Sequence, residues 1–141
     1  MSTITRVRTK NGTIFASLAG LTALAVLLQG LWAGIFLEHD GKRDAASSWI
    51  DAHARGGEVA LALAAITTVF AVWKLRPRKE LWIGSAILTV LMILESYLGG
   101  LIRDASKDTL TAVHVPLGMA IMGLVIWITV RVRTGNRVAT S

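Results

Sequence analysis

Two histidines, His53 and His114, are the residues of this chain best suited to bind a metal or a cofactor. A neutral imidazole is a common metal ligand, and two of them that face each other can take both axial positions of one haem iron. His114 lies in an apolar stretch, 109–130, that contains no Asp, Glu, Lys or Arg. Ionisable side chains within such stretches are rare and mark functional sites by default. The two residues therefore predict a bis-histidine haem site, if the fold brings them together.

The lack of cysteine restricts the chemistry of this site. A thiolate-held zinc ion or iron–sulfur cluster is excluded, as is covalent haem attachment through a C-x-x-C-H motif. A haem at this site would therefore be held without covalent attachment to cysteine, with His53 and His114 as its iron ligands.

A glycine follows each of these histidines at helical spacing. Gly57 lies four residues after His53, and Gly118 lies four residues after His114, so on helices each glycine shares a face with its histidine. Because glycine has no side chain, such a face leaves room for a flat macrocycle beside the histidine. Small residues at this spacing also let membrane helices approach each other without any ligand. The spacing alone is compatible with both interpretations.

Other polar residues extend the predicted site. Glu95 is the single charged residue of the stretch 81–102, where a carboxylate can accept a hydrogen bond from a ligand's ring nitrogen, relay protons or serve only as an interhelical contact. Arg55 and Arg103 are expected to bind the haem propionates, because guanidinium groups grip carboxylates through two hydrogen bonds. His39, in a polar connection, is expected to be a solvated surface residue.

Four apolar segments must position these residues, at about 13–37, 53–75, 81–102 and 109–130. A helix of roughly 20 residues crosses a bilayer core, and continuous rather than alternating apolar runs favour helices over a barrel. Short connections predict an up-and-down bundle in which the second and fourth helices face each other diagonally. The predicted fold is an all-α, integral membrane four-helix bundle that forms one domain over residues 1–141.

Basic residues orient this bundle in the membrane. Connections rich in Lys and Arg stay in the cytoplasm, so both termini are expected on the cytoplasmic side of a bacterial cytoplasmic membrane, with the histidines near the outer face. The same distribution accounts for the net charge of +6, so no nucleic-acid partner is indicated. The orienting residues are Arg6, Arg8, Lys10, Lys74, Arg76, Arg78, Lys79, Arg131, Arg133 and Arg137.

Part of the sequence resembles haem A synthase. The stretches from Glu95 to Ile102, with its Leu-Gly-Gly, and from Thr111 to Gly118 are similar to the third helix, outer loop and start of the fourth helix in one half of that family. His53 matches the family's other haem-ligand position. The resemblance covers about the last three helices. It implies a four-helix bundle that holds one b-type haem between His53 and His114.

The chain departs from this family in two respects. Haem A synthases join two such halves, whereas this chain corresponds to one, so a homodimer would be needed to restore both. The family's glutamate three residues before the ligand histidine is replaced by Ile50, with only Asp51 nearby. The family's oxidation of a haem methyl group therefore does not carry over with the resemblance.

These observations predict an electron carrier that acts alone or as a small subunit of a respiratory or quinone-linked complex. Two alternatives stay open. The first is a haem-modifying or oxidising enzyme that uses Glu95 as a proton relay and needs an open axial position on the iron. The second is an accessory subunit without a cofactor, in which the histidines only pack against neighbours or face water.

Overall fold

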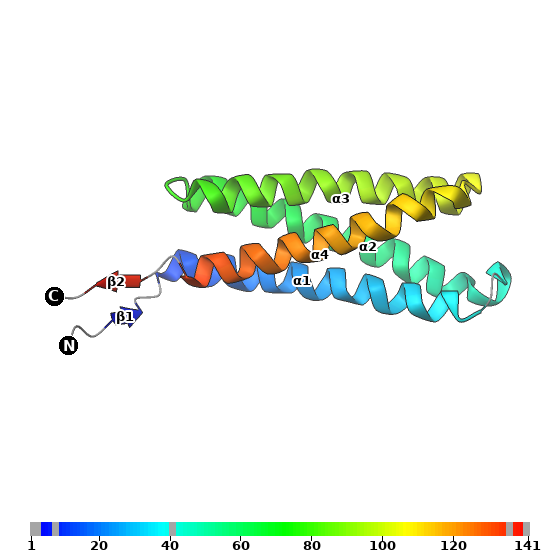
Figure 1. The fold of residues 1–141 in the computed structure, drawn as a ribbon, viewed down its shortest axis with the longest axis horizontal. Coiled ribbons are helices and arrows are strands. Elements are labelled where there is room, and N and C mark those ends of the chain that lie inside the picture. The colour runs from blue at the N-terminus through cyan, green and yellow to red at the C-terminus, as the bar shows by residue number, and fades with distance from the viewer. Residues whose placement is uncertain (1–3, 7–8, 40–41, 135–136, 140–141) are drawn as a thin grey trace.

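Four long helices carry the four apolar segments (Figure 1). The computed structural model of the protein describes residues 4–6, 9–39, 42–134 and 137–139. All four helices are long and apolar enough to cross a membrane. The elements in chain order are β1 (Ile4–Arg6), α1 (Lys10–Leu37), α2 (Arg43–Lys74), α3 (Lys79–Ala105), the short 3₁₀ helix η1 (Asp108–Leu110), α4 (Thr111–Thr134) and β2 (Arg137–Ala139).

The four helices form a closed ring around one core. Each helix packs against the next helix along the chain, and α1 also packs against α4, so α2 and α4 are diagonal partners. The predicted up-and-down four-helix bundle is thereby confirmed. Its interior is filled by apolar side chains that are almost completely buried, among them Phe15, Leu81, Leu88, Ile121 and Ile128.

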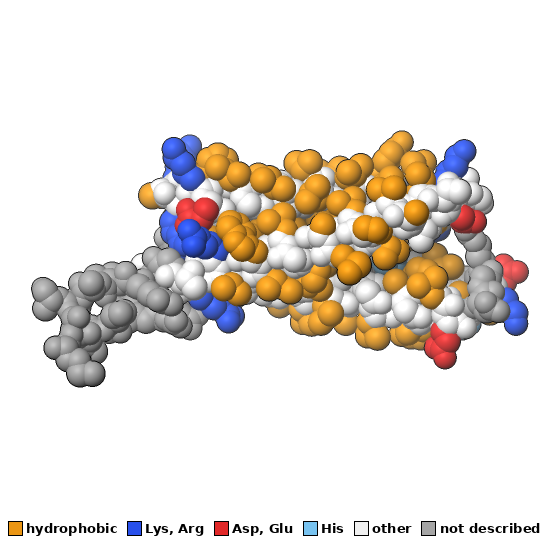
Figure 2. All heavy atoms as spheres, viewed as in Figure 1, with side chains coloured by type: hydrophobic (Ala, Val, Ile, Leu, Met, Phe, Trp, Pro, Cys, Tyr) orange, Lys and Arg blue, Asp and Glu red, His pale blue; other side chains and the backbone are white. Residues whose placement is uncertain are grey.

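Large apolar side chains also cover the outside of the bundle, as Figure 2 shows for one face. Leu27, Val69, Val90 and Met119, one from each helix, are all more than half exposed. An outer surface of this kind is stable in a lipid environment and not in water. The chain is therefore a four-span membrane protein whose helices contact the bilayer.

Helix α2 is longer than the apolar pattern predicts. It begins at Arg43, whereas the predicted segment begins near residue 53. The additional turns include Asp44, whose charge suits a helix N-terminus, and Ser47, whose hydroxyl donates to the Asp44 carbonyl oxygen (3.0 Å). Hydropathy detects only the part of a helix that enters lipid, so it misses such an extension. His53 therefore lies inside α2 and not at its start.

Arg78, in the α2–α3 connection, forms hydrogen bonds to the end of α4. Its guanidinium donates to the carbonyl oxygens of Arg131 (3.1 Å) and Val132 (3.3 Å) and to the Glu80 carboxylate (2.9 Å). The last carbonyls of a helix lack intrahelical partners and carry partial negative charge, so a cation stabilises them. This contact closes the end of the bundle that is opposite His114.

The strands β1 and β2 bring the two ends of the chain together. They pair antiparallel, with Ile4 opposite Ala139 and Arg6 opposite Arg137, and Figure 1 shows them beyond the start of α1 and the end of α4. Strands of three residues are too short to show a periodic pattern, so the sequence does not predict them.

Candidate functional site

His53 and His114 meet across the diagonal of the bundle. His53 projects from α2 and His114 from α4, and their ring centroids are 6.2 Å apart with the ring planes at 69°. The two helices run in the same direction in an up-and-down bundle, so residues near corresponding depths face each other. The structure thus brings together the two residues that the sequence analysis singles out.

Helix α1 orients His53. The Nδ1–H of His53 donates to the backbone carbonyl oxygen of Gln29 (3.1 Å), because a carbonyl can only accept. The Phe36 ring packs edge-on against the same imidazole at 5.5 Å between centroids. With the proton on Nδ1, Nε2 of the neutral ring carries the lone pair that a metal needs. The hydrogen bond to Gln29 thus fixes the tautomer of His53 in which Nε2 is able to bind a metal.

Helix α3 supplies the corresponding neighbour of His114. Glu95 Oε1 lies 3.3 Å from His114 Nδ1, and both side chains are less than one-fifth exposed. The distance is that of an ion pair, but the angles do not meet those of a hydrogen bond. His114 Nδ1 and Glu95 Oε2 are both buried without a hydrogen-bond partner among the described residues. Glu95 and His114 thus approach each other between α3 and α4 without the hydrogen bond that was one of the options for Glu95.

Gln29 is a member of this site that the sequence analysis missed. Both atoms of its side-chain amide are buried and have no hydrogen-bond partner in the described part of the chain. Together Gln29, His53, Glu95 and His114 supply one polar side chain from each of the four helices, and we call these four residues the histidine cluster. Gln29 is the one residue with a side-chain amide within 13–37, and this isolated polar residue in an apolar segment is the sequence signal for its place in the site.

The predicted glycines lie beside the histidine cluster. A Cβ atom at Gly118 would lie 3.0 Å from Glu95 Oε1, and one at Gly57 would lie 3.7 Å from Gln29 Oε1. Gly99 is a further close neighbour, since a Cβ there would lie 3.3 Å from Cε1 of His114. The small residues thus make room for the polar side chains of α1 and α3, which occupy the faces assigned to a macrocycle.

The two predicted propionate partners lie on the surface of α2 and α3. Arg55 on α2 is exposed. Arg103, in the last turn of α3, is also exposed, and its guanidinium donates to both carboxylate oxygens of Asp104 (2.6 and 3.0 Å). His39 follows the C-cap of α1, and its Nδ1–H donates to the Ile35 carbonyl oxygen of that helix (2.9 Å).

The donor set of the histidine cluster fits a haem better than a bare metal ion. No three His, Cys, Asp or Glu side chains gather as metal ligands among the described residues, and a structural metal needs about four ligands. A macrocycle supplies the others and needs only two axial nitrogens. Metal–imidazole bonds of about 2 Å on each side are compatible with the observed separation of the rings. The unpaired buried atoms of Gln29 and Glu95 leave unused hydrogen-bonding capacity beside the two rings, which is costly for buried groups.

Compared with models of protein families, with curated proteins and with solved structures, the chain has no match.

Proposed function

We propose that the chain is a membrane cytochrome that binds one haem b between His53 and His114 and carries electrons. The observation that carries this proposal is the approach of the two imidazoles to 6.2 Å from diagonal helices, with His53 Nδ1 hydrogen-bonded to the Gln29 carbonyl oxygen and His114 Nδ1 3.3 Å from the Glu95 carboxylate. Such outer contacts orient a metal-binding histidine and leave its Nε2 for the metal. The resemblance to one half of haem A synthase involves the same two histidines and supports the same cofactor.

The residues of the chain would hold the group and insulate it. When bound, haem supplies a one-electron couple. His53 and His114 would both hold the group through their Nε2 atoms, so it would serve electron transfer rather than the binding of a substrate. Gly57 and Gly118 add no side-chain bulk of their own to the adjacent helix faces, which Gln29 and Glu95 occupy and would have to leave for the group to bind. Arg55 and Arg103 are the predicted cations for the propionates. To bind a propionate, Arg103 would give up its hydrogen bonds to Asp104.

The proposed setting is a bacterial cytoplasmic membrane with both termini in the cytoplasm. The charge distribution supports this orientation, because the end of the bundle with the α2–α3 connection is rich in basic side chains. The side chains of Arg6, Arg8 and Arg137, which also enter the argument, lie outside the described residues. The electron partners would be a respiratory or quinone-linked complex, with this chain as a small subunit, or a second copy of the chain in a homodimer.

Absorption spectra of the protein purified in detergent from haem-replete cells test the proposal. We expect sharp α and β bands on reduction, as a low-spin iron with two nitrogen axial ligands gives. Carbon monoxide should leave these bands unchanged, because both axial positions are occupied. Binding of carbon monoxide would favour the haem-modifying enzyme instead. A featureless visible spectrum would contradict both haem functions and leave the accessory subunit.

A substitution of Glu95 tests how the neighbour of His114 acts. Glu95→Gln keeps the size of the side chain but removes its negative charge, so the imidazole becomes a weaker donor to iron and the oxidised state loses stabilisation. We expect a full haem content and a more positive midpoint potential in a potentiometric titration. For a one-electron couple, each tenfold change in the preference between the two oxidation states corresponds to about 59 mV.

Glu58→Gln is the matched control, because Glu58 is an exposed residue of α2 outside the histidine cluster. This variant should keep the wild-type potential. If both substitutions shift the potential equally, the effect is a general one of removed charge, and Glu95 has no specific role at His114.

A further inference from the structure

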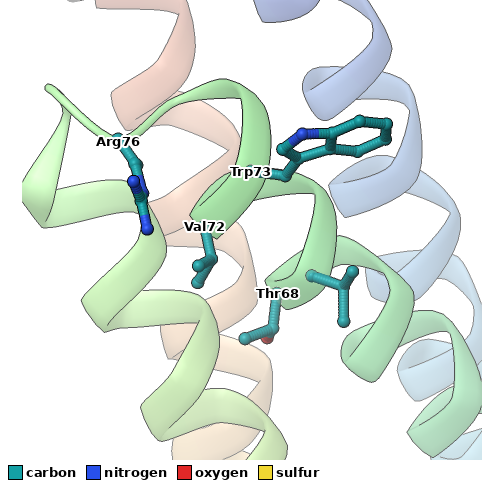
Figure 3. A pocket seen from close by; sticks show the side chains of 5 residues that line it. Thr68, Val72, Trp73 and Arg76 are labelled. Carbon is teal, nitrogen blue, oxygen red and sulfur yellow. The ribbon is translucent and has the colours of Figure 1, made fainter.

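An open groove of about 430 Å³ lies on the outer surface of α2, near the α2–α3 connection. Its lining residues are Thr68, Val69, Val72, Trp73 and Arg76. Figure 3 shows Arg76 reaching down from the connection on the side of α2 to which Val72 and Thr68 point. The groove thus has an apolar floor within the membrane-spanning helix and one cation at its mouth.

The floor of the groove needs no polar ligand. The Thr68 hydroxyl donates to the Ala64 carbonyl oxygen (3.0 Å) and lies 2.9 Å from the Thr89 hydroxyl of α3. The hydroxyl therefore already has hydrogen-bond partners within the protein. Val69 and Trp73 are 66% and 71% exposed. Apolar side chains that face outward at this depth suit the hydrocarbon of a lipid chain.

The end of the bundle around this groove is strongly basic, and Figure 2 shows blue side chains gathered there. Two cations near the groove are already engaged. Arg78 binds Glu80 and the carbonyls of α4, and the Lys74 ammonium lies 3.6 Å above the Trp73 ring. Arg76 is exposed at the mouth. The described basic residues of this end are Lys10, Lys74, Arg76, Arg78, Lys79, Arg131 and Arg133, against one acidic residue, Glu80.

We propose that this groove is a binding site for an anionic phospholipid. The Arg76 guanidinium binds the headgroup phosphate through paired hydrogen bonds, and one acyl chain lies along Val72, Val69 and the Trp73 ring. Charge selects the occupant, because a neutral phospholipid would leave the positive end of the bundle uncompensated. This inference does not depend on haem binding, which concerns the opposite end of the helices.

Tryptophan quenching by brominated lipid tests the site. The full-length protein is reconstituted into phosphatidylcholine vesicles that contain a small fraction of either brominated phosphatidylglycerol or brominated phosphatidylcholine. Bromine on an acyl chain quenches an indole that it touches, and Trp73 lines the groove. The wild type should be quenched more strongly by the anionic lipid than by the same mole fraction of the neutral lipid. Random orientation in the vesicle does not matter, because both leaflets have the same composition.

Three variants with changes at exposed side chains locate the excess quenching. Arg76→Ala should reduce the relative binding of the anionic lipid about fivefold, the factor that corresponds to roughly 1 kcal/mol for one basic residue near a membrane surface. Trp73→Phe should lose the excess because the reporter is gone. Arg133→Ala, at the same end but on α4, should keep it.

Equal quenching of the wild type by both lipids would overturn the proposal. An excess that survives in Trp73→Phe would place the lipid elsewhere, and the proposal would be wrong. Equal losses in Arg76→Ala and Arg133→Ala would mean a diffuse attraction to the basic end rather than a site, which also contradicts it.

Discussion

Substitution of either His53 or His114 by alanine is expected to abolish the sharp reduced bands of a low-spin haem. The two rings lie 6.2 Å apart on α2 and α4, so in the proposed cytochrome each would supply one of the two nitrogens that hold the haem. The loss should be complete in each variant rather than graded, because a low-spin six-coordinate iron needs both ligands. Spectra and haem content of the purified variants measure it.

His39→Ala is the control for these two substitutions. His39 makes its hydrogen bond to Ile35, within α1 and its C-terminal cap, and not to the histidine cluster, so this variant should retain the wild-type bands. Loss of the bands in His39→Ala with retention in His114→Ala would mean that a different pair of histidines binds the haem.

Gly56→Ala should destabilise the contact between α1 and α2. A Cβ atom at this position would overlap the indole of Trp32 and the side-chain amide of Gln29. Overpacking of this kind costs about 1–3 kcal/mol. Since Gln29 also accepts the hydrogen bond of His53, displacement of α1 should lower the haem content as well. Thermal denaturation in detergent and the haem-to-protein ratio measure the two effects.

Gly30→Ala separates this clash from the general effect of the substitution. A Cβ at Gly30 meets nothing within 4 Å, and both substitutions share the helix-propensity gain of about 1 kcal/mol. Gly30→Ala should therefore be as stable as the wild type or more so. Equal denaturation temperatures for the two variants would contradict the close packing at Gly56.

The helical architecture was predictable because a bilayer admits few alternatives. Long apolar runs must become helices to satisfy their backbone groups, and short connections then fix an antiparallel ring. The same reasoning placed His53 and His114 on the diagonal, where the structure has them in contact. The start of α2 at Arg43 was not predictable in this way, because those turns lie outside the apolar pattern and depend on local effects such as the charge of Asp44 at the helix N-terminus.

The surroundings of the histidines were harder to predict. Glu95 stands out in its segment by charge, whereas Gln29 is uncharged and does not interrupt the apolar run of α1. Its role rests on a backbone carbonyl, which every residue possesses, and on an amide whose direction depends on the packing of Gly56 and Gly57. As the one amide within 13–37, Gln29 can be recognised as a polar residue of the first helix, but the residue type does not show which atoms it contacts. The pairing of Arg103 with Asp104 likewise depends on side-chain conformation and not on spacing.

The two imidazoles are anchored by different kinds of atom, and this affects how the protein can change over generations. The partner of His53 is the main chain of α1, so no single exchange of a side chain removes that acceptor. The polar neighbour of His114 Nδ1 is the carboxylate of Glu95, which one codon change can alter. Substitutions at position 95 during evolution would therefore change the surroundings of His114. Substitutions in α1 would leave the carbonyl oxygen that orients His53.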